Sequence, residues 1–193
     1  LFDMVKLHDI SKTYISTMTT DEVFDAVTAW SKEYDKELNA LIMKDTDYAK
    51  SIFSIERGNK KPRKDIGKWR EIKDYIAYFY DELFDGEYEW ADNVSDADKK
   101  AILTKYKDEY NHNALSEDWF PQIQELAESL GFAKSPKDYK ADPDAFKGHA
   151  GDVAGVIRVA VTGRLNTPDL YSIMQTLGKE KVLERLNLAI ERV

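Results

Sequence analysis

A stretch of basic residues is the part of this sequence whose residue types point most directly to ligand binding. Between Arg57 and Lys73 the chain carries eight bases and only two acids, a local charge of +6. Gly58 and Pro62 interrupt the stretch, so it predicts a loop with backbone N–H groups open to phosphate. Such a loop suits a polyanion, and Trp69 beside it offers a ring on which a nucleic-acid base can stack.

The plainer interpretation of this stretch is a solvated loop that pairs with acidic residues. Asp81 to Asp98 contains eight acids and no base, and the whole chain of 193 residues has a net charge of −8. Non-specific attraction to nucleic acid is therefore not a global tendency, and a polyanion would have to be met by a local patch. On composition alone both interpretations stay open.

The second candidate lies between Arg158 and Leu170. Arg158 falls inside an apolar helical stretch, where a permanent charge is costly unless it has a partner. Pairing with Asp152 or Asp169 would make it a structural residue. The alternative is that Arg158 supports or joins a binding site at the turn that follows Gly163.

That turn carries polar residues to the start of a further helix. Arg164, Asn166 and Thr167 precede Pro168, which suits the first position of a helix. A helix N-terminus offers N–H groups to an anion or to the edge of a base. The plainer interpretation makes Thr167 an ordinary helix cap.

Patterns for catalysis or metal binding are missing from the sequence. The chain has no Cys, no Gly-x-Ser-x-Gly and no phosphate-binding loop motif. Glu109-x-x-His112 has the spacing of a carboxylate-bridged metal site in a helical bundle, but the required second pair is absent. We therefore expect neither an active site nor a metal site in this chain.

Apolar residues recur at helical spacing through nearly the whole chain, and strand alternation is hard to find. The sequence therefore predicts an all-α fold. The clearest stripe predicts four continuous helical turns and consists of Trp69, Ile72, Ile76, Phe79 and Leu83.

Polar residues interrupt the helical spacing at 85–93, which indicates a joint. A boundary near residue 92 divides the chain into two packed helical subdomains, residues 1–92 and 93–193. The longest apolar stretch is too short to cross a bilayer, and no export leader is present, so we expect no membrane partner and a cytoplasmic location. The start at Leu1 rather than Met suggests a fragment of a longer protein.

The residues from Gly151 to Leu170 resemble the carboxy-terminal signature of bacterial glutamyl-tRNA synthetases, which are class I aminoacyl-tRNA synthetases. They read Gly-Asp-Val-Ala-Gly-Val-Ile-Arg-Val-Ala-Val-Thr-Gly-Arg-Leu-Asn-Thr-Pro-Asp-Leu. Residues 7–14, 60–65 and 75–80 are also similar to segments of this family. The resemblance therefore covers nearly the entire chain.

This resemblance implies a helical cage that binds the anticodon of glutamate tRNA, within an ATP-dependent glutamate-tRNA ligase. The two ATP-site signatures of the family are absent from this sequence, so catalysis, ATP and Mg²⁺ would belong to other parts of the parent enzyme. No cofactor is expected in this chain.

The resemblance also implies roles for individual residues. Arg158, Thr167, Pro168 and Leu170 match positions that contact anticodon bases in the family. Arg63, with Arg57 as the alternative, is the candidate for the arginine that reads the first anticodon base.

Other basic and polar residues would contact the RNA around these positions. At the turn they are Arg164 and Asn166. In the basic loop they are the lysines that would neutralise phosphates: Lys60, Lys61, Lys64 and Lys68.

A function from another class also fits the charge pattern. The chain would then be a helical protein-interaction scaffold whose basic loop meets an acidic partner protein. Charge reversal at Lys60, Lys61 and Arg63 would abolish that interaction, and tRNA would have no effect on the chain.

Overall fold

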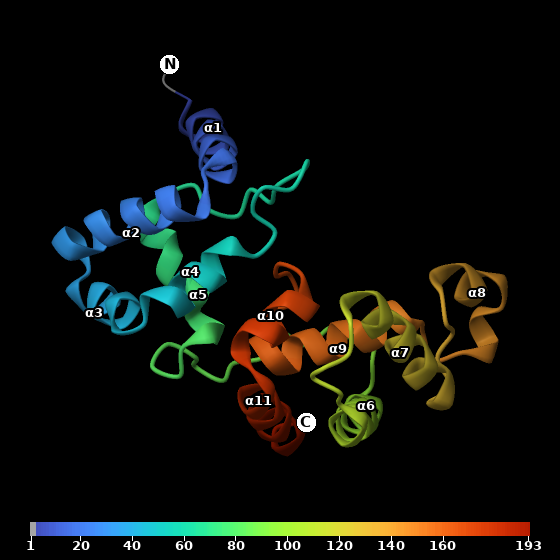
Figure 1. Cartoon of the computed structure of the whole chain (residues 1–193). Helices are drawn as coiled ribbons and strands as arrows, with labels where there is room; N and C mark the ends of the chain where they lie inside the picture. The colour runs from blue at the N-terminus through green and yellow to red at the C-terminus, as the bar shows by residue number, and fades with distance from the viewer. Residues whose placement is uncertain (1–2) are drawn as a thin grey trace. The chain divides into compact units, whose positions relative to one another are not determined.

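The fold is all-helical, as the sequence predicts. The computed structural model describes residues 3–193 (Figure 1); Leu1 and Phe2, where the sequence starts, lie outside the described residues. Within this range there are eleven α-helices and no β-strand, and Ala133 and His149 form one isolated bridge. The chain folds into two compact units, the first ending at Phe84 and the second comprising Asp85–Val193.

The first unit packs four helices and a series of short helical turns around an apolar core. Helix α2 packs against α3 and α4. The core includes Val23, Val27, Ile42, Ile52 and Phe53, all at most 1% exposed. The elements are α1 (Met4–Thr17), α2 (Thr20–Tyr34), α3 (Lys36–Lys44), α4 (Thr46–Ser54), η1 (Trp69–Glu71), α5 (Ile72–Ile76) and η2 (Ala77–Phe79).

The stripe from Trp69 to Leu83 does not form the continuous helix that its spacing predicts. It folds as η1, α5 and η2, and the chain becomes extended at Tyr80. Tyr78, Phe79 and Tyr80 are all buried, although a regular helix would turn three successive side chains in different directions. The hydroxyl of Tyr48 donates to the carbonyl of Phe79 at 2.9 Å, which satisfies an acceptor left open where the helical turns end.

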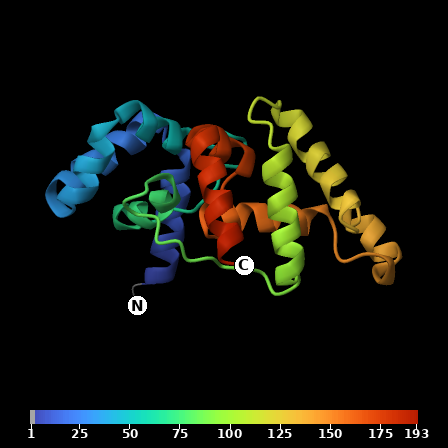
Figure 2. The same ribbon diagram turned by 90° about the horizontal axis from the view of Figure 1, so that it is seen from below.

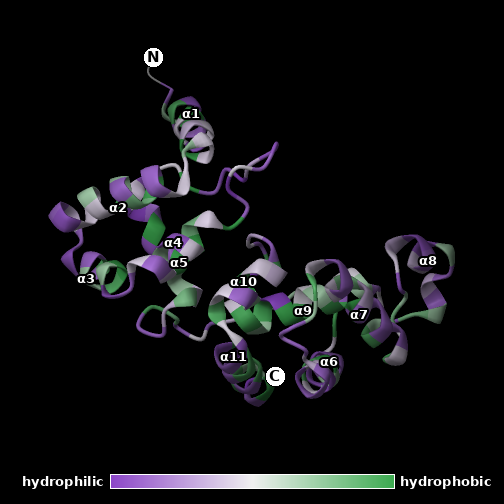
Figure 3. Cartoon of the chain, in the orientation of Figure 1, coloured by the Kyte–Doolittle hydropathy of each residue, from purple (hydrophilic) through white to green (hydrophobic). Residues whose placement is uncertain are grey.

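The second unit is built around α9, whose ribbon is largely hydrophobic (Figure 3). Helix α9 contacts α6, α7 and α11, and Figure 2 shows α6 and α11 side by side across it. Gly163, with a left-handed φ of 77°, ends α9. The elements are α6 (Asp96–Glu109), α7 (Ser116–Ser129), α8 (Pro136–Ala141), η3 (Pro143–Ala145), α9 (Ala150–Thr162), α10 (Leu170–Leu177) and α11 (Lys179–Glu191).

The polar segment 85–93 has no regular secondary structure and bonds to helices of the second unit. The guanidinium of Arg192 donates to the carbonyl of Gly86 at 2.6 Å, and the amide of Asn93 donates to the carboxylate of Asp152 at 2.8 Å. These bonds explain why the structure divides at 84/85 and assigns this segment to the second unit. None of the helices in residues 3–193 has the length and apolar character needed to cross a bilayer.

Candidate nucleic-acid interface

The basic stretch forms a loop between α4 and η1, and its ribbon is mostly hydrophilic (Figure 3). Lys60, Lys61, Lys64 and Lys68 are exposed. Their side chains make no ion pair or hydrogen bond with any of residues 3–193. The loop therefore presents four ammonium groups to solvent, as a phosphate-binding surface requires.

Acids of the stretch from Asp81 to Asp98 pair with other bases. Glu82 lies 3.6 Å from the ammonium of Lys44. Two further ion pairs join Asp96 to Lys99 at 2.9 Å and Asp98 to Lys147 at 2.7 Å. These pairs do not involve the basic loop, so they give no support to the interpretation of a loop neutralised by this acidic stretch.

The end of the loop is anchored to α1 and η1. The carboxylate of Glu71 accepts the N–H groups of Gly67 at 2.8 Å and Lys68 at 3.2 Å, and the hydroxyl of Ser11 donates to the carbonyl of Gly67 at 2.7 Å. Burial pushes the pKa of Glu71 upward, but these two N–H bonds, together with the electrostatic effects of His8 and Lys12, lower the pKa below its usual value. A Cβ at Gly67 would lie 2.2 Å from the ring of His8, so close packing on α1 requires glycine there.

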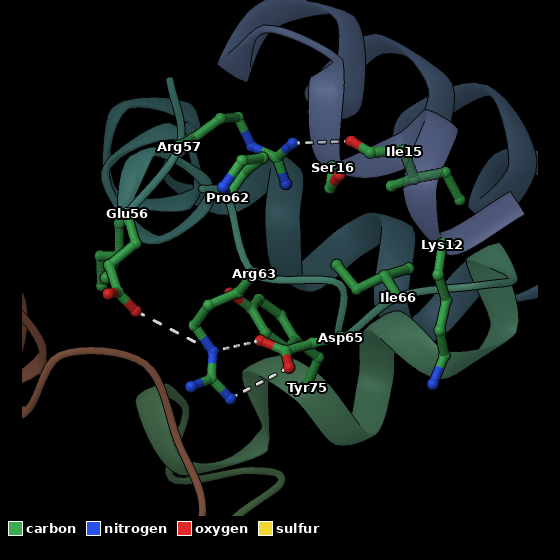
Figure 4. Close-up of a pocket in the computed structure, with 11 residues that line it drawn as sticks. Lys12, Ile15, Ser16, Glu56, Arg57, Pro62, Arg63, Asp65, Ile66 and Tyr75 are labelled. Carbon is green, nitrogen blue, oxygen red and sulfur yellow. Dashed lines mark hydrogen bonds and ion pairs between the residues drawn. The ribbon is translucent and has the colours of Figure 1, made fainter. Parts of the chain in front are cut away.

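Arg57 is half-buried at the root of the loop (Figure 4). Its Nε donates to the carbonyl of Phe53 at 2.9 Å, and its Nη1 donates to the carbonyls of Ile15 at 2.9 Å and Met18 at 3.0 Å. Burial lowers the pKa of this guanidinium. Arg57 thus joins the C-terminal ends of α1 and α4, and this is a structural role that the sequence did not indicate.

Arg63 borders the same small pocket as Arg57 (Figure 4). Its guanidinium makes a two-pronged pair with the carboxylate of Asp65, at 2.7 and 3.0 Å, and lies 3.9 Å from the carboxylate of Glu56. The Asp65 hydrogen bond raises the pKa of Arg63. Burial raises the pKa of Tyr75, which also lines the pocket, to about 12. The two hydrogen bonds to Asp65 hold the plane of the Arg63 guanidinium in a fixed orientation. A guanidinium held in this way can pair with a planar group such as the edge of a base.

In the second unit, Arg158 organises the turn after α9. Its Nη1 donates to the carbonyls of Pro168 at 2.8 Å and Thr167 at 3.3 Å, and also to the hydroxyl of Thr167. The positive charge of Arg158, which lies within α9, is therefore hydrogen-bonded to acceptors in the turn between Gly163 and Asp169. This is the turn that the sequence indicates as a candidate binding element. Arg158, Thr167 and Pro168 are brought together as one structural cluster.

Glu89, in the polar segment 85–93, supports the same turn. Its backbone N–H donates to the carbonyl of Gly163 at 2.8 Å, and its carboxylate accepts the N–H of Leu165 at 3.2 Å. Sequence reasoning missed this residue because it lies 76 positions before Leu165, and nothing local marks the contact.

Thr167 is not the helix cap that the sequence predicts. Helix α10 begins at Leu170 and its N-cap is Asp169, whose carboxylate accepts the N–H of Ser172 at 2.8 Å. The hydroxyl of Thr167 is instead occupied by Arg158 and by the carbonyl of Pro168, to which it donates at 3.0 Å. Pro168 therefore precedes the helix and does not occupy its first position.

We expect Asp169→Ala to lower the free energy of unfolding by about 1 kcal/mol, because it leaves the first N–H groups of α10 without a cap. Asp169→Asn keeps a capping oxygen, so it should lower the free energy of unfolding by less than Asp169→Ala does. Urea unfolding of both variants checks this prediction. Equal losses would show that capping is not the main contribution of Asp169.

The turn exposes only some of the residues implied by the resemblance. Thr167 and Pro168 are buried, and Leu170 is 1% exposed, so its side chain belongs to the core and presents no surface to a base in this structure. Asn166 is exposed and Arg164 is half-buried. Direct contacts of these buried residues with RNA would therefore involve backbone atoms or a rearranged turn.

The spacing Glu109-x-x-His112 has a structural explanation. Glu109 pairs with Lys105 at 2.7 Å, and the ring of His112 hydrogen-bonds to the hydroxyl of Tyr110 at 2.9 Å. Among residues 3–193 no group of three or more His, Asp or Glu side chains is arranged to hold a metal ion.

Residues 61–190 match the family described as anticodon binding domain. The chain belongs to this family of anticodon-binding domains.

Several relatives of the chain are glutamate–tRNA ligases. The chain is 44% identical over 190 residues to the glutamate–tRNA ligase of Clostridium perfringens strain 13, covering 96% of this chain and 35% of the relative. It is 41% identical over 186 residues to that of Acetivibrio thermocellus and 39% identical over 188 residues to that of Sorangium cellulosum, covering 34% and 33% of those proteins. The chain thus spans about a third of the length of these relatives and is homologous to their C-terminal region.

Proposed function

We propose that this chain binds tRNA and reads the anticodon of glutamate tRNA, as part of a glutamate-tRNA ligase that works in the cytoplasm. The catalytic step would take place on residues outside this chain. The observation that carries the proposal is the set of four exposed lysines without acidic partners, in a chain that belongs to the anticodon-binding domain family. Unpaired loop bases expose their edges, and such lysines can neutralise the phosphates beside them.

The arginine that reads an anticodon base is Arg63 in this proposal. Arg57 is the weaker candidate because its guanidinium already donates to three backbone carbonyls. Arg63 is held by carboxylates at the pocket edge, and a carboxylate-held guanidinium has the fixed plane that bidentate base recognition needs.

In the second unit, we propose that the turn from Gly163 to Asp169 is the other RNA-binding element. Arg164 and Asn166 would contact the nucleotide directly. Arg158 holds the turn through Thr167 and Pro168 and would act on RNA binding mainly by positioning.

The test is a titration with glutamate tRNA and with an unrelated tRNA at two salt concentrations. If about five phosphates are engaged, the log–log salt slope should be about −3.5, from roughly 0.7 per phosphate. We expect tighter binding of glutamate tRNA at both concentrations. Equal affinity for the two tRNAs would contradict specific reading, and binding of neither would contradict the function altogether.

We expect the triple variant Lys60→Ala, Lys61→Ala, Lys64→Ala to flatten the salt slope by about 2, because three phosphate contacts are lost. Its stability should stay within about 0.5 kcal/mol of the parent chain, since the side chains are exposed and unpaired.

The control for this triple variant is the change of three exposed lysines elsewhere, Lys100, Lys137 and Lys179, to Ala. It alters the net charge equally and should leave the slope nearer its original value. Equal flattening by both triple variants would show that the effect is one of overall charge and not of the loop.

A further inference from the structure

The first unit has a second groove beside α1, and neither Arg57 nor Arg63 lines it. Its wall on α1 consists of Ser11, Tyr14 and Ile15, which share one helix face. The opposite side is formed by Trp30 of α2 and by the end of the basic loop, from Gly67 to Arg70. The groove therefore joins three segments that are distant in the sequence.

Three aromatic rings line this groove. Tyr14 is 69% exposed, and Trp30 and Trp69 are partly exposed. Neither indole N–H donates a hydrogen bond to any of residues 3–193. Tyr34, which is 67% exposed, stacks on the ring of Trp30 at a centroid distance of 5.8 Å and extends the aromatic surface. Rings of this kind that remain partly open to solvent offer faces for a planar ligand.

Cationic side chains stand beside these rings. Lys68 and Arg70 line the groove and are exposed, and neither makes an ion pair with the part of the chain described here. Proteins bind single-stranded nucleic acid by stacking its bases on aromatic rings and placing cations against its phosphates. This groove offers both kinds of group. An uncharged apolar ligand would make no ion pair with Lys68 or Arg70, so the two cations favour a ligand with negative charge.

The groove is also held in shape before any ligand arrives. Gly67 is fixed by the hydroxyl of Ser11 and the carboxylate of Glu71, and the same carboxylate holds the N–H of Lys68. Since the backbone that carries Lys68 and Trp69 is already bonded, little ordering would remain to be done on binding.

We infer that this groove, formed by Tyr14, Trp30, Trp69, Lys68 and Arg70, binds an unpaired nucleotide of RNA. The base stacks on the aromatic rings, and its phosphate lies against the two cations. Neither Arg63 nor any residue of the turn after α9 lines this groove. The inference rests on the proposed function, because it requires RNA at this unit.

Photocrosslinking tests it directly. The probe is an anticodon stem-loop RNA with 5-bromouridine at each unpaired position in turn, together with a single-stranded oligouridine carrying the same label. After irradiation of the complex with the intact chain, mass spectrometry locates the crosslinked residue. We expect crosslinks to Tyr14, Trp30 or Trp69.

Binding of the unlabelled RNAs by variants gives a second measurement. We expect Tyr14→Leu and Trp69→Leu each to weaken binding roughly tenfold, because a stacking face is lost while apolar bulk is kept. Tyr14 is exposed, so its variant remains informative if Trp69→Leu affects folding. The control is Phe120→Leu on α7, an exposed ring (42%) outside the groove, which should change affinity less than twofold.

Crosslinks confined to other residues, with unchanged affinity in Tyr14→Leu and Trp69→Leu, would overturn this inference and leave the tRNA-binding function standing. If RNA affinity is unchanged but Tyr14→Leu abolishes self-association, the groove belongs to a second copy of this chain and the inference is again overturned. Absence of RNA binding by the parent chain would contradict both the inference and the proposed function.

Discussion

Arg57→Ala should lower the free energy of unfolding of the first unit by about 3 kcal/mol. The guanidinium donates to the carbonyls of Phe53, Ile15 and Met18, and hydrogen bonds to a charged group are worth more than neutral ones. Its loss leaves acceptors at the ends of α1 and α4 without a partner in a half-buried place. Urea unfolding followed by tryptophan fluorescence measures the change, and Trp30 and Trp69 are the tryptophans of this unit.

Lys60→Ala is the matched control for this prediction, since Lys60 lies in the same loop but is exposed and unpaired. It should change stability by less than about 0.5 kcal/mol. The loss of stability in Arg57→Lys should lie between the losses in Arg57→Ala and Lys60→Ala. The single ammonium of lysine cannot reach all three carbonyls as the guanidinium does. If Arg57→Ala unfolds like the parent chain but loses RNA affinity, Arg57 reads a base and our structural assignment is wrong.

Arg158→Ala should have the second large effect, on stability and on RNA binding together. Removing Arg158 takes away the charged donor that the hydroxyl of Thr167 and the carbonyls of Thr167 and Pro168 share, at a cost of about 2 kcal/mol. The turn between Gly163 and Asp169 then loses its fixed shape, and tRNA binding should weaken about tenfold or more. Hydrogen exchange should rise at Leu165 and at the start of α10.

Arg164→Ala provides the comparison for Arg158→Ala. Arg164 is half-buried and enters the turn through its backbone N–H, which donates to the hydroxyl of Thr162 at 3.1 Å. An alanine keeps that backbone bond, so we expect weaker RNA binding with little loss of stability. Equal shifts of thermal unfolding in the two variants would show that the Arg164 side chain is part of the structure and not of the binding surface.

The sequence predicts the helical content of this chain well because apolar spacing is a local property. The stripe on α9 and the stop at Gly163 are examples, and both are observed. The exception is the segment from Trp69 to Leu83, where burial of three successive aromatic residues overrides the helical period.

The candidate site was harder to predict, since the functions of its residues depend on partners far away in the chain. The sequence indicates a basic loop, and the exposed lysines agree with it. It does not show that Arg57 bonds to Ile15, 42 positions earlier, or that Trp30 lies beside Trp69 in one groove. The role of Thr167 was misjudged because Asp169, two residues later, is an equally good cap by type and makes the capping bond.

Footprinting of a glutamate tRNA anticodon stem-loop on this chain shows whether the chain covers the anticodon itself. Chemical probing with and without the chain reports which bases lose access. We expect protection of the anticodon bases, reduced in Arg63→Ala and Arg164→Ala but not in the Lys100, Lys137 and Lys179 control. Unchanged reactivity of the anticodon bases under saturating chain, or protection limited to the stem, would contradict this expectation.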